Sequence, residues 1–130
     1  MYNLIIDLEM CNVQRDYWRR SYKYANETIQ IGAILLGENF KRISTLCQYV
    51  HSEYGVIDHF IESLTDIRNS QVKNAPRMQE ALLHMIDWLG DREYQIYVWS
   101  ESDRAQIVHE IKAKKITDEK ILAFVEKENW

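Results

Sequence analysis

A short apolar run close to the start of the chain limits the fold more than any other feature. Residues 2–8 read YNLIIDL, and an apolar run with β-branched side chains is typical of a strand buried on both faces in the middle of a sheet. Because side chains at positions i and i+2 of a strand share a face, Asp7 and Glu9 should point the same way, with Leu8 on the other face. The run therefore predicts a central strand with two carboxylates aimed together at its carboxyl end.

The remaining patterns place strands first and helices later. Two β-rich runs joined by the link GENFK predict an antiparallel hairpin. The polar and aromatic stretch at 10–26 has no sustained period, and we expect a long loop there. Strands are predicted at 28–36, 42–50 and 94–99, and helices at 57–64, at 77–89, from 100–103 onward and from Thr117 onward. This order predicts one α/β domain over residues 1–130, with a mixed sheet flanked by helices.

Each predicted helix carries an apolar stripe that we expect to face the core. Ala75 and Pro76 mark the start of the second helix, because proline favours the first turn. The stripes of the other helices are Ile57, Phe60, Ile61 and Leu64, then Ile107, Val108 and Ile111, and finally Ile121, Leu122, Phe124 and Val125.

The charge and cysteine content exclude several classes of protein. Sixteen Lys and Arg against twenty Asp and Glu leave a formal net charge of -4, so a site for a polyanion must be local. Cys11 and Cys47 are too few to staple a secreted scaffold and have no zinc-binding spacing. The N-terminal apolar run reaches an acid at once and predicts neither a secretion signal nor a membrane span. We therefore expect a cytoplasmic protein that does not engage membranes.

A third carboxylate follows the last predicted strand. Asp103 lies at the strand-to-helix turn of WSESDRAQI. If this strand neighbours the first, Asp7, Glu9 and Asp103 converge at one edge of the sheet, and such a cluster repels itself unless metal ions neutralise it. A plain structural interpretation also exists, because DLE can be a strand reaching water and an acid in a first helical turn is favoured by the helix dipole. The cluster favours Mg²⁺ or Mn²⁺ as cofactor.

Several segments together resemble the DEDD superfamily of 3′–5′ exonucleases. These proteins have a ribonuclease H-like fold and include the proofreading subunit of bacterial replicative polymerase, ribonuclease T and oligoribonuclease. IIDLEM is similar to the first motif of the family and VWSESDRAQI to the second. Between them, in the family's order, stand ETIQIGAILL, IDHFIESLTDI and VKNAPRMQEALLHMIDWL, with LTD where many relatives have LTG.

The resemblance implies two-metal hydrolysis of phosphodiesters at the 3′ end of single-stranded DNA or RNA. In that scheme Asp7 would bridge two Mg²⁺ or Mn²⁺ ions, Glu9 would help to hold the ion that activates water, and Asp103 would support the second ion. Leu64 and Thr65 match residues that contact the terminal nucleotides.

The family's third motif, a histidine general base followed by an aspartate in the last helix, has no counterpart here. The last histidine is His109, on the helix that follows Asp103, and the aspartate beyond it is Asp118, without the required spacing. We therefore expect a chain that lacks the last strand and helix of the fold, and its general base is unknown. Because general base catalysis contributes about 10²–10⁴-fold, residues 1–130 should hydrolyse substrate poorly or not at all.

The stretch RDYWRRSYKY at 15–24 mixes basic and aromatic side chains, as expected where phosphates are held and bases stack. Trp18 and Arg19 are accordingly candidate substrate-binding residues. The aromatic side chains could equally pack on the edge of the sheet.

Two functions from different classes fit these patterns. The first is a metal-dependent exonuclease that acts on single-stranded 3′ ends. The second is a catalytically silent module that kept the fold and binds nucleic acid or protein. An exposed sheet edge left by a missing last strand would favour pairing between chains, so a homodimer is a further expectation.

Overall fold

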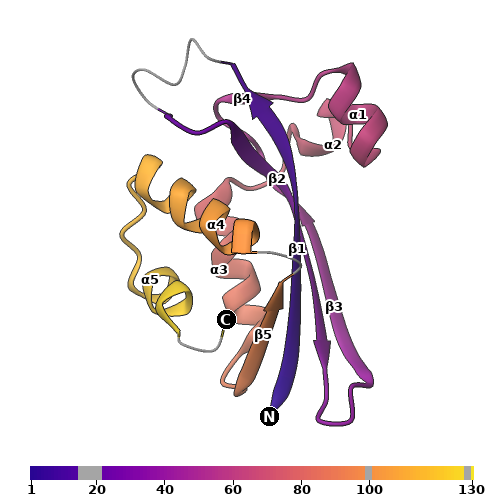
Figure 1. Ribbon diagram of the computed structural model, residues 1–130, viewed down its shortest axis with the longest axis vertical. Helices are drawn as coiled ribbons and strands as arrows, with labels where there is room; N and C mark the ends of the chain where they lie inside the picture. The colour runs from indigo at the N-terminus through magenta and orange to yellow at the C-terminus, as the bar shows by residue number, and fades with distance from the viewer. Residues whose placement is uncertain (15–21, 99–100, 128–129) are drawn as a thin grey trace.

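The protein is an α/β domain built around one mixed sheet, as a computed structural model shows for residues 1–14, 22–98, 101–127 and 130 (Figure 1). The strands are β1 (Tyr2–Val13), β2 (Asn26–Leu36), β3 (Arg42–Tyr49), β4 (Gly55–Val56) and β5 (Tyr94–Val98). The helices are α1 (His59–Thr65), α2 (Asn69–Val72), α3 (Met78–Leu89), α4 (Glu101–Ala113) and α5 (Glu119–Glu126). The predicted fold class and the predicted hairpin of β2 and β3 are both confirmed.

Strand β1 is the centre of the sheet. It pairs antiparallel with β2 along one edge, and on its other edge it pairs parallel with β5 and, near its carboxyl end, antiparallel with β4. The parallel pair runs from Tyr2 opposite Tyr94 to Ile6 opposite Val98. Strands β1 and β5 are therefore neighbours, which is the condition on which the predicted carboxylate cluster depended. Their pairing brings the start of α4 toward the middle of β1.

Two separate apolar clusters hold the elements together. Leu4, Ile6 and Leu8 alternate along β1 and are buried in the larger cluster with side chains of α3, α4 and α5. In Figure 1 these three helices lie on one side of β1, whereas α1 and α2 lie on the other side near its upper end. The smaller cluster joins α1 and α2 to the sheet through Cys11 and Ile29.

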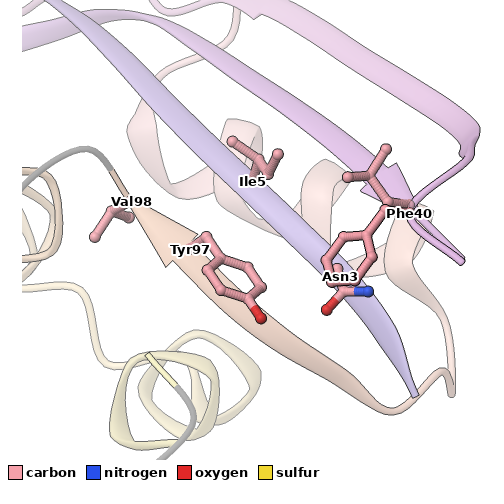
Figure 2. A pocket seen from close by; sticks show the side chains of 6 residues that line it. Asn3, Ile5, Phe40, Tyr97 and Val98 are labelled. Carbon is pink, nitrogen blue, oxygen red and sulfur yellow. The ribbon is translucent and has the colours of Figure 1, made fainter. Parts of the chain in front are cut away.

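Strand β1 is not buried on both faces as predicted, because the face that carries Ile5 and Asp7 is less covered than the face that carries Leu4 and Ile6. Figure 2 shows an apolar pocket of about 300 Å³ on this face, with Asn3 and Ile5 from β1 and Tyr97 and Val98 from β5 along its wall. Phe40 at its rim is 62% exposed and Tyr97 is 46% exposed, so large apolar side chains of the pocket remain in contact with water.

Several predicted boundaries are wrong. The loop was predicted at 10–26, but β1 continues to Val13. At the other end of the predicted loop, β2 already starts at Asn26. Cys11 and Val13 are buried, but the polar residues around them interrupt the apolar pattern by which a strand is recognised in the sequence. The last helix begins after Asp118, whose side chain caps it, instead of at Thr117. The short elements β4 and α2 were not predicted at all.

Two predicted apolar stripes are wrong in part. In the helix predicted at 57–64, Ile57, which precedes α1, and Ile61 are buried, but Phe60 is 63% exposed and Leu64 is 69% exposed. On α4, Ile107 and Ile111 are buried as predicted and Val108 only partly. Polar side chains, namely Asp103, Gln106 and Glu110, occupy the rest of the buried face of α4. Within the described ranges, no helix is long and apolar enough to cross a bilayer.

Candidate active site

Strand β1 presents Asp7 and Glu9 on the same face, as its alternation requires. Asp7 is exposed, and Glu9 is half-buried just before an irregularity in the pairing of β1 with β2. Gly32 stands directly opposite Asp7, so no side chain of β2 crowds this carboxylate from the facing position. A β-carbon at Gly32 would make an ordinary contact of 3.5 Å with the Asp7 carbonyl oxygen, so sterics alone do not demand glycine there.

Asp103 joins these two acids from another element. It lies in the first turn of α4 and is only 6% exposed. Burial and then the negative charge of Asp7 raise the pKa of Asp103. Burial, followed by the charges of Asp7 and Asp103, likewise raises the pKa of Glu9. The structure therefore brings the three predicted carboxylates within electrostatic reach of one another.

The chemistry of this cluster suits a hard divalent cation, although the three described side chains are too far apart to coordinate one ion together. Carboxylate oxygens are the donors that Mg²⁺ and Mn²⁺ prefer. In the part of the chain that the structure describes, none of the three acids forms an ion pair with Lys or Arg, so their negative charge is uncompensated. No three His, Cys, Asp or Glu side chains among the same residues lie close enough to hold one ion together. The charges fit a cation, and binding would have to draw the side chains closer.

Leu64 and Thr65 lie at the end of α1 and play different parts. Leu64 projects into water one turn after the equally exposed Phe60, and the two form an apolar ridge on the helix surface. The Thr65 hydroxyl instead donates a hydrogen bond to the Ile61 carbonyl at 2.8 Å and accepts one from the backbone N–H of Ile67. Leu64 is thus available to a ligand, whereas the Thr65 hydroxyl is used within the protein.

Asp66 explains why the sequence can read LTD where many relatives of the predicted family have LTG. This residue caps α1 with a positive φ of 61°, and its N–H donates to the Glu62 carbonyl. Glycine is the usual residue in that left-handed conformation, and aspartate is among the few others that tolerate it. The departure from the motif therefore leaves the backbone turn intact.

Comparison with known proteins decides the family. The model of the RNase_T family, described as exonuclease, matches residues 4–124. This chain belongs to that exonuclease family. No curated protein sequence matches the chain.

Solved exonuclease structures have the same fold. A full-length 3′-exonuclease superposes with a TM-score of 0.74 at 22% identity, over 89% of this chain and 40% of the other. A 3′-exonuclease bound to a histone mRNA stem-loop gives 0.75 at 22%, over 89% of this chain and 54% of the other. E. coli exonuclease I in complex with a dT13 oligonucleotide gives 0.60 at 12%, over 82% and 22%. The predicted exonuclease fold is confirmed, and the chain spans about half or less of the length of these proteins.

The basic and aromatic stretch before β2 is only partly placed. Trp18 and Arg19 lie outside the described residues. The end of the stretch is anchored, because Tyr22 is buried and stacks on Tyr54 with ring centroids 5.2 Å apart, while Tyr24 stacks on His109 at 4.1 Å. Of this stretch, Tyr22 and Tyr24 therefore lie against side chains of α4, because Gln106 donates to the Tyr22 hydroxyl and His109 stacks on Tyr24.

A buried charge network lies farther along α4 than Asp103 and was not predicted. The ammonium group of Lys114 is 2.7 Å from Glu27 and 2.8 Å from Glu110, and both acids are fully buried. The i, i+4 spacing of Glu110 and Lys114 is a helix signal that the sequence contains. The participation of Glu27, from a distant strand, has no signal in the sequence.

The network keeps Lys114 and Glu27 charged. Burial alone would lower the pKa of Lys114, but the charges of Glu110 and Glu27 outweigh it and hold that pKa above its ordinary value. Burial would raise the pKa of Glu27, but Lys114 and hydrogen bonds from the backbone lower it instead. Nearby, burial and the charge of Glu27 raise the pKa of the Cys11 thiol to about 12, so this cysteine is an inert core residue.

Proposed function

We propose that this exonuclease-family domain hydrolyses phosphodiesters at the 3′ end of single-stranded DNA or RNA with the help of Mg²⁺ or Mn²⁺. The observation that carries the proposal is that Asp7, Glu9 and Asp103 lie close enough for their charges to act on one another, without a compensating basic partner among the described residues. Clusters of acids that raise one another's pKa are expensive to keep unless the site uses a cation.

Asp7, Glu9 and Asp103 would hold the metal through their carboxylate oxygens. Bound ions lower the pKa of the attacking water and neutralise charge that develops on the phosphate. In the reaction, water adds to phosphorus, the bond from phosphorus to the 3′ oxygen breaks, and a proton reaches that oxygen as the terminal nucleotide leaves. The general base is not identified, since His109 and Asp118 lack the spacing of the family's third motif.

Leu64, Thr65, Trp18 and Arg19 are the proposed substrate contacts. The exposed ridge of Leu64 and Phe60 offers an apolar surface on which an unstacked base could lie. Related structures contain a histone mRNA stem-loop or a dT13 oligonucleotide, which supports a nucleic-acid substrate for this fold. Replacing Leu64 with Ser should weaken binding of a short oligonucleotide without changing stability, whereas Ser63→Ala on the same exposed turn should have no effect on binding.

A catalytically silent binding module is the second candidate. The observation that favours it is the open arrangement of the acids, which do not enclose an ion in the described part of the chain. The two candidates differ in metal dependence. Binding of Mn²⁺ at the carboxylates should raise the melting temperature by mass action, and Asp7→Ala should abolish that shift.

Hydrolysis is tested with the 130-residue chain, Mn²⁺ and a 5′-labelled single-stranded oligonucleotide. Shortening from the 3′ end that disappears in Asp7→Ala supports the exonuclease, and the rate should be low because no general base is found. Oligonucleotide binding without hydrolysis or a metal-dependent shift would support the silent module instead. Asp91→Asn, an exposed acid in a turn, controls for loss of a carboxylate elsewhere.

Two further expectations belong to the proposal. Cys11 and Cys47 are both free thiols, as expected in a reducing compartment, and we place the protein in the cytoplasm. We also propose that the chain forms a homodimer through its incompletely covered sheet.

A further inference from the structure

We propose that Glu110 and Lys114 are positioning residues that hold Asp103 in register with Asp7 and Glu9. This inference rests on the proposed metal site and adds residues to it that touch neither metal nor substrate. The network of these two side chains fastens α4 to β2, and α4 carries Asp103 while β2 pairs with the strand that carries the other two acids.

Beside the buried Ile107 and Ile111, the buried face of α4 carries a polar stripe that starts at Asp103. Asp103, Gln106, Glu110 and Lys114 follow one another at helical spacing, and the first three are at most 7% exposed. The side chain of Lys114 is only 5% exposed. A helix that packs on a sheet ordinarily does so through apolar side chains, so this stripe fixes α4 by directional hydrogen bonds in addition to packing.

Glu110 binds β2 beside the irregularity that follows Glu9. The register of β1 and β2 shifts between Glu9 and Met10, and Thr28 is the first residue of β2 paired beyond the shift. Thr28 donates twice to one carboxylate oxygen of Glu110, from its N–H at 3.1 Å and from its hydroxyl at 2.5 Å. Gln106 donates to the same oxygen at 2.9 Å. One side chain of α4 therefore fixes the strand segment opposite the site.

Lys114 extends the attachment to a third segment. Its ammonium group bridges Glu110 and Glu27, and the Glu27 carboxylate accepts the backbone N–H groups of Glu53, Tyr54 and Gly55 at 2.7–2.8 Å. Gln106 also donates to the Asn26 carbonyl at 2.9 Å. The start of β2, the turn before β4 and helix α4 are thus joined through one buried cation.

Such a network can act on the site because metal ligands must be held within a fraction of an ångström. Misplacement of a reacting group by about 1 Å can cost about 10²-fold in rate. A buried ion pair is weak evidence for stability alone, since an apolar replacement is often as stable. A positioning role predicts an effect on metal affinity in variants that are still folded, whereas a purely stabilising role does not.

The test compares Glu110→Gln and the milder Thr28→Val with matched controls in the full chain. Glu126→Gln makes the same charge change on an exposed helix position, and Thr45→Val makes the same change on an exposed strand position. Affinity for Mn²⁺ is measured at 25 °C from the signal of free Mn²⁺ in electron paramagnetic resonance, after circular dichroism has shown each variant to be folded. Amide hydrogen exchange is followed at Thr28 and in the first turn of α4.

The expected result is Mn²⁺ binding about 10-fold weaker in both network variants, with faster exchange at Thr28 and around Asp103 and no change in the controls. Unchanged affinity in folded variants overturns the inference and leaves the proposed function intact. If the wild-type chain binds no Mn²⁺, or if Asp7→Ala binds equally well, the proposed function fails. In that case hydrogen exchange alone tests the positioning role. Exchange at the start of α4 that is the same in Glu110→Gln and in the wild type overturns it.

Discussion

Asp7 on β1 lies close enough to Asp103 on α4 for its charge to add to the effect of burial in raising the pKa of Asp103. The same charge contributes, after burial, to the raised pKa of Glu9. Without a bound cation the folded protein therefore holds negative charges that repel one another. This relationship connects the stability of the domain to pH and to the identity of residue 7.

Asp7→Asn should stabilise the metal-free protein at pH 7 by about 0.5–2 kcal/mol. Glu9 and Asp103 have raised pKa values in the folded state, so just above pH 4 the folded wild type binds more protons than the unfolded chain. Its free energy of unfolding therefore falls as the pH rises through this range. The advantage of Asp7→Asn should consequently shrink from pH 7 to pH 4. Urea unfolding in EDTA, followed by circular dichroism at both pH values, measures it.

The matched control for that substitution is Asp91→Asn, which changes an exposed acid in a turn. A surface change of this kind should alter the free energy of unfolding by less than about 0.5 kcal/mol. Equal stabilities of the two variants at pH 7 would contradict the repulsion inferred at the site.

Lys114→Met should lower the free energy of unfolding by about 3–5 kcal/mol, because it leaves Glu27 and Glu110 buried without their cation. Lys112→Met makes the same change two positions earlier on the exposed side of α4 and should stay within about 0.5 kcal/mol of the wild type. Urea unfolding at neutral pH compares the three proteins. A loss in Lys114→Met no larger than in Lys112→Met would show that the buried carboxylates do not need this partner.

Trp18→Ala and Arg19→Ala should each weaken binding of a fluorescent single-stranded oligonucleotide. Loss of a stacked base should cost about 1–3 kcal/mol, and loss of one phosphate contact should reduce the slope of log affinity against log salt by about 0.7. Fluorescence anisotropy across a KCl series measures both quantities. The exposed pair Phe40→Ala and Arg42→Ala serves as control. Identical salt slopes for Arg19→Ala and Arg42→Ala would show that Arg19 does not contact a phosphate.

The proposed homodimer should dissociate when a charge is placed on the open sheet face. Tyr97 is 46% exposed beside the apolar pocket of Figure 2, and burying a carboxylate there in an interface would be costly. Light scattering after size exclusion should give a dimer for the wild type at tens of micromolar and a monomer for Tyr97→Glu. Phe60→Glu, at an equally exposed apolar position on α1, should leave the dimer intact. A monomeric wild type would remove the expectation.

Much of the fold could be predicted because its main elements have local patterns. The apolar run at 2–8 located β1 as the central strand, and the alternation along it put Asp7 and Glu9 on one face with Leu8 on the other. Helix α3 and the hairpin of β2 and β3 likewise follow from the period of their apolar residues and from their turn. The family too could be recognised, since its segments occur in order along the chain.

The sequence by itself thus determined the main strands and helices and the family, and it singled out the three acids as candidates. Only the tertiary structure decided which of those residues meet. Asp103 reaches Asp7 because β5 pairs parallel with β1, Leu64 faces water because Ile57 and Ile61 already fill the contact of α1 with the sheet, and Lys114 finds Glu27 across the domain. Those outcomes depend on contacts between residues far apart in the chain, and the hydrophobic period that reveals a strand or helix contains no information about its partner.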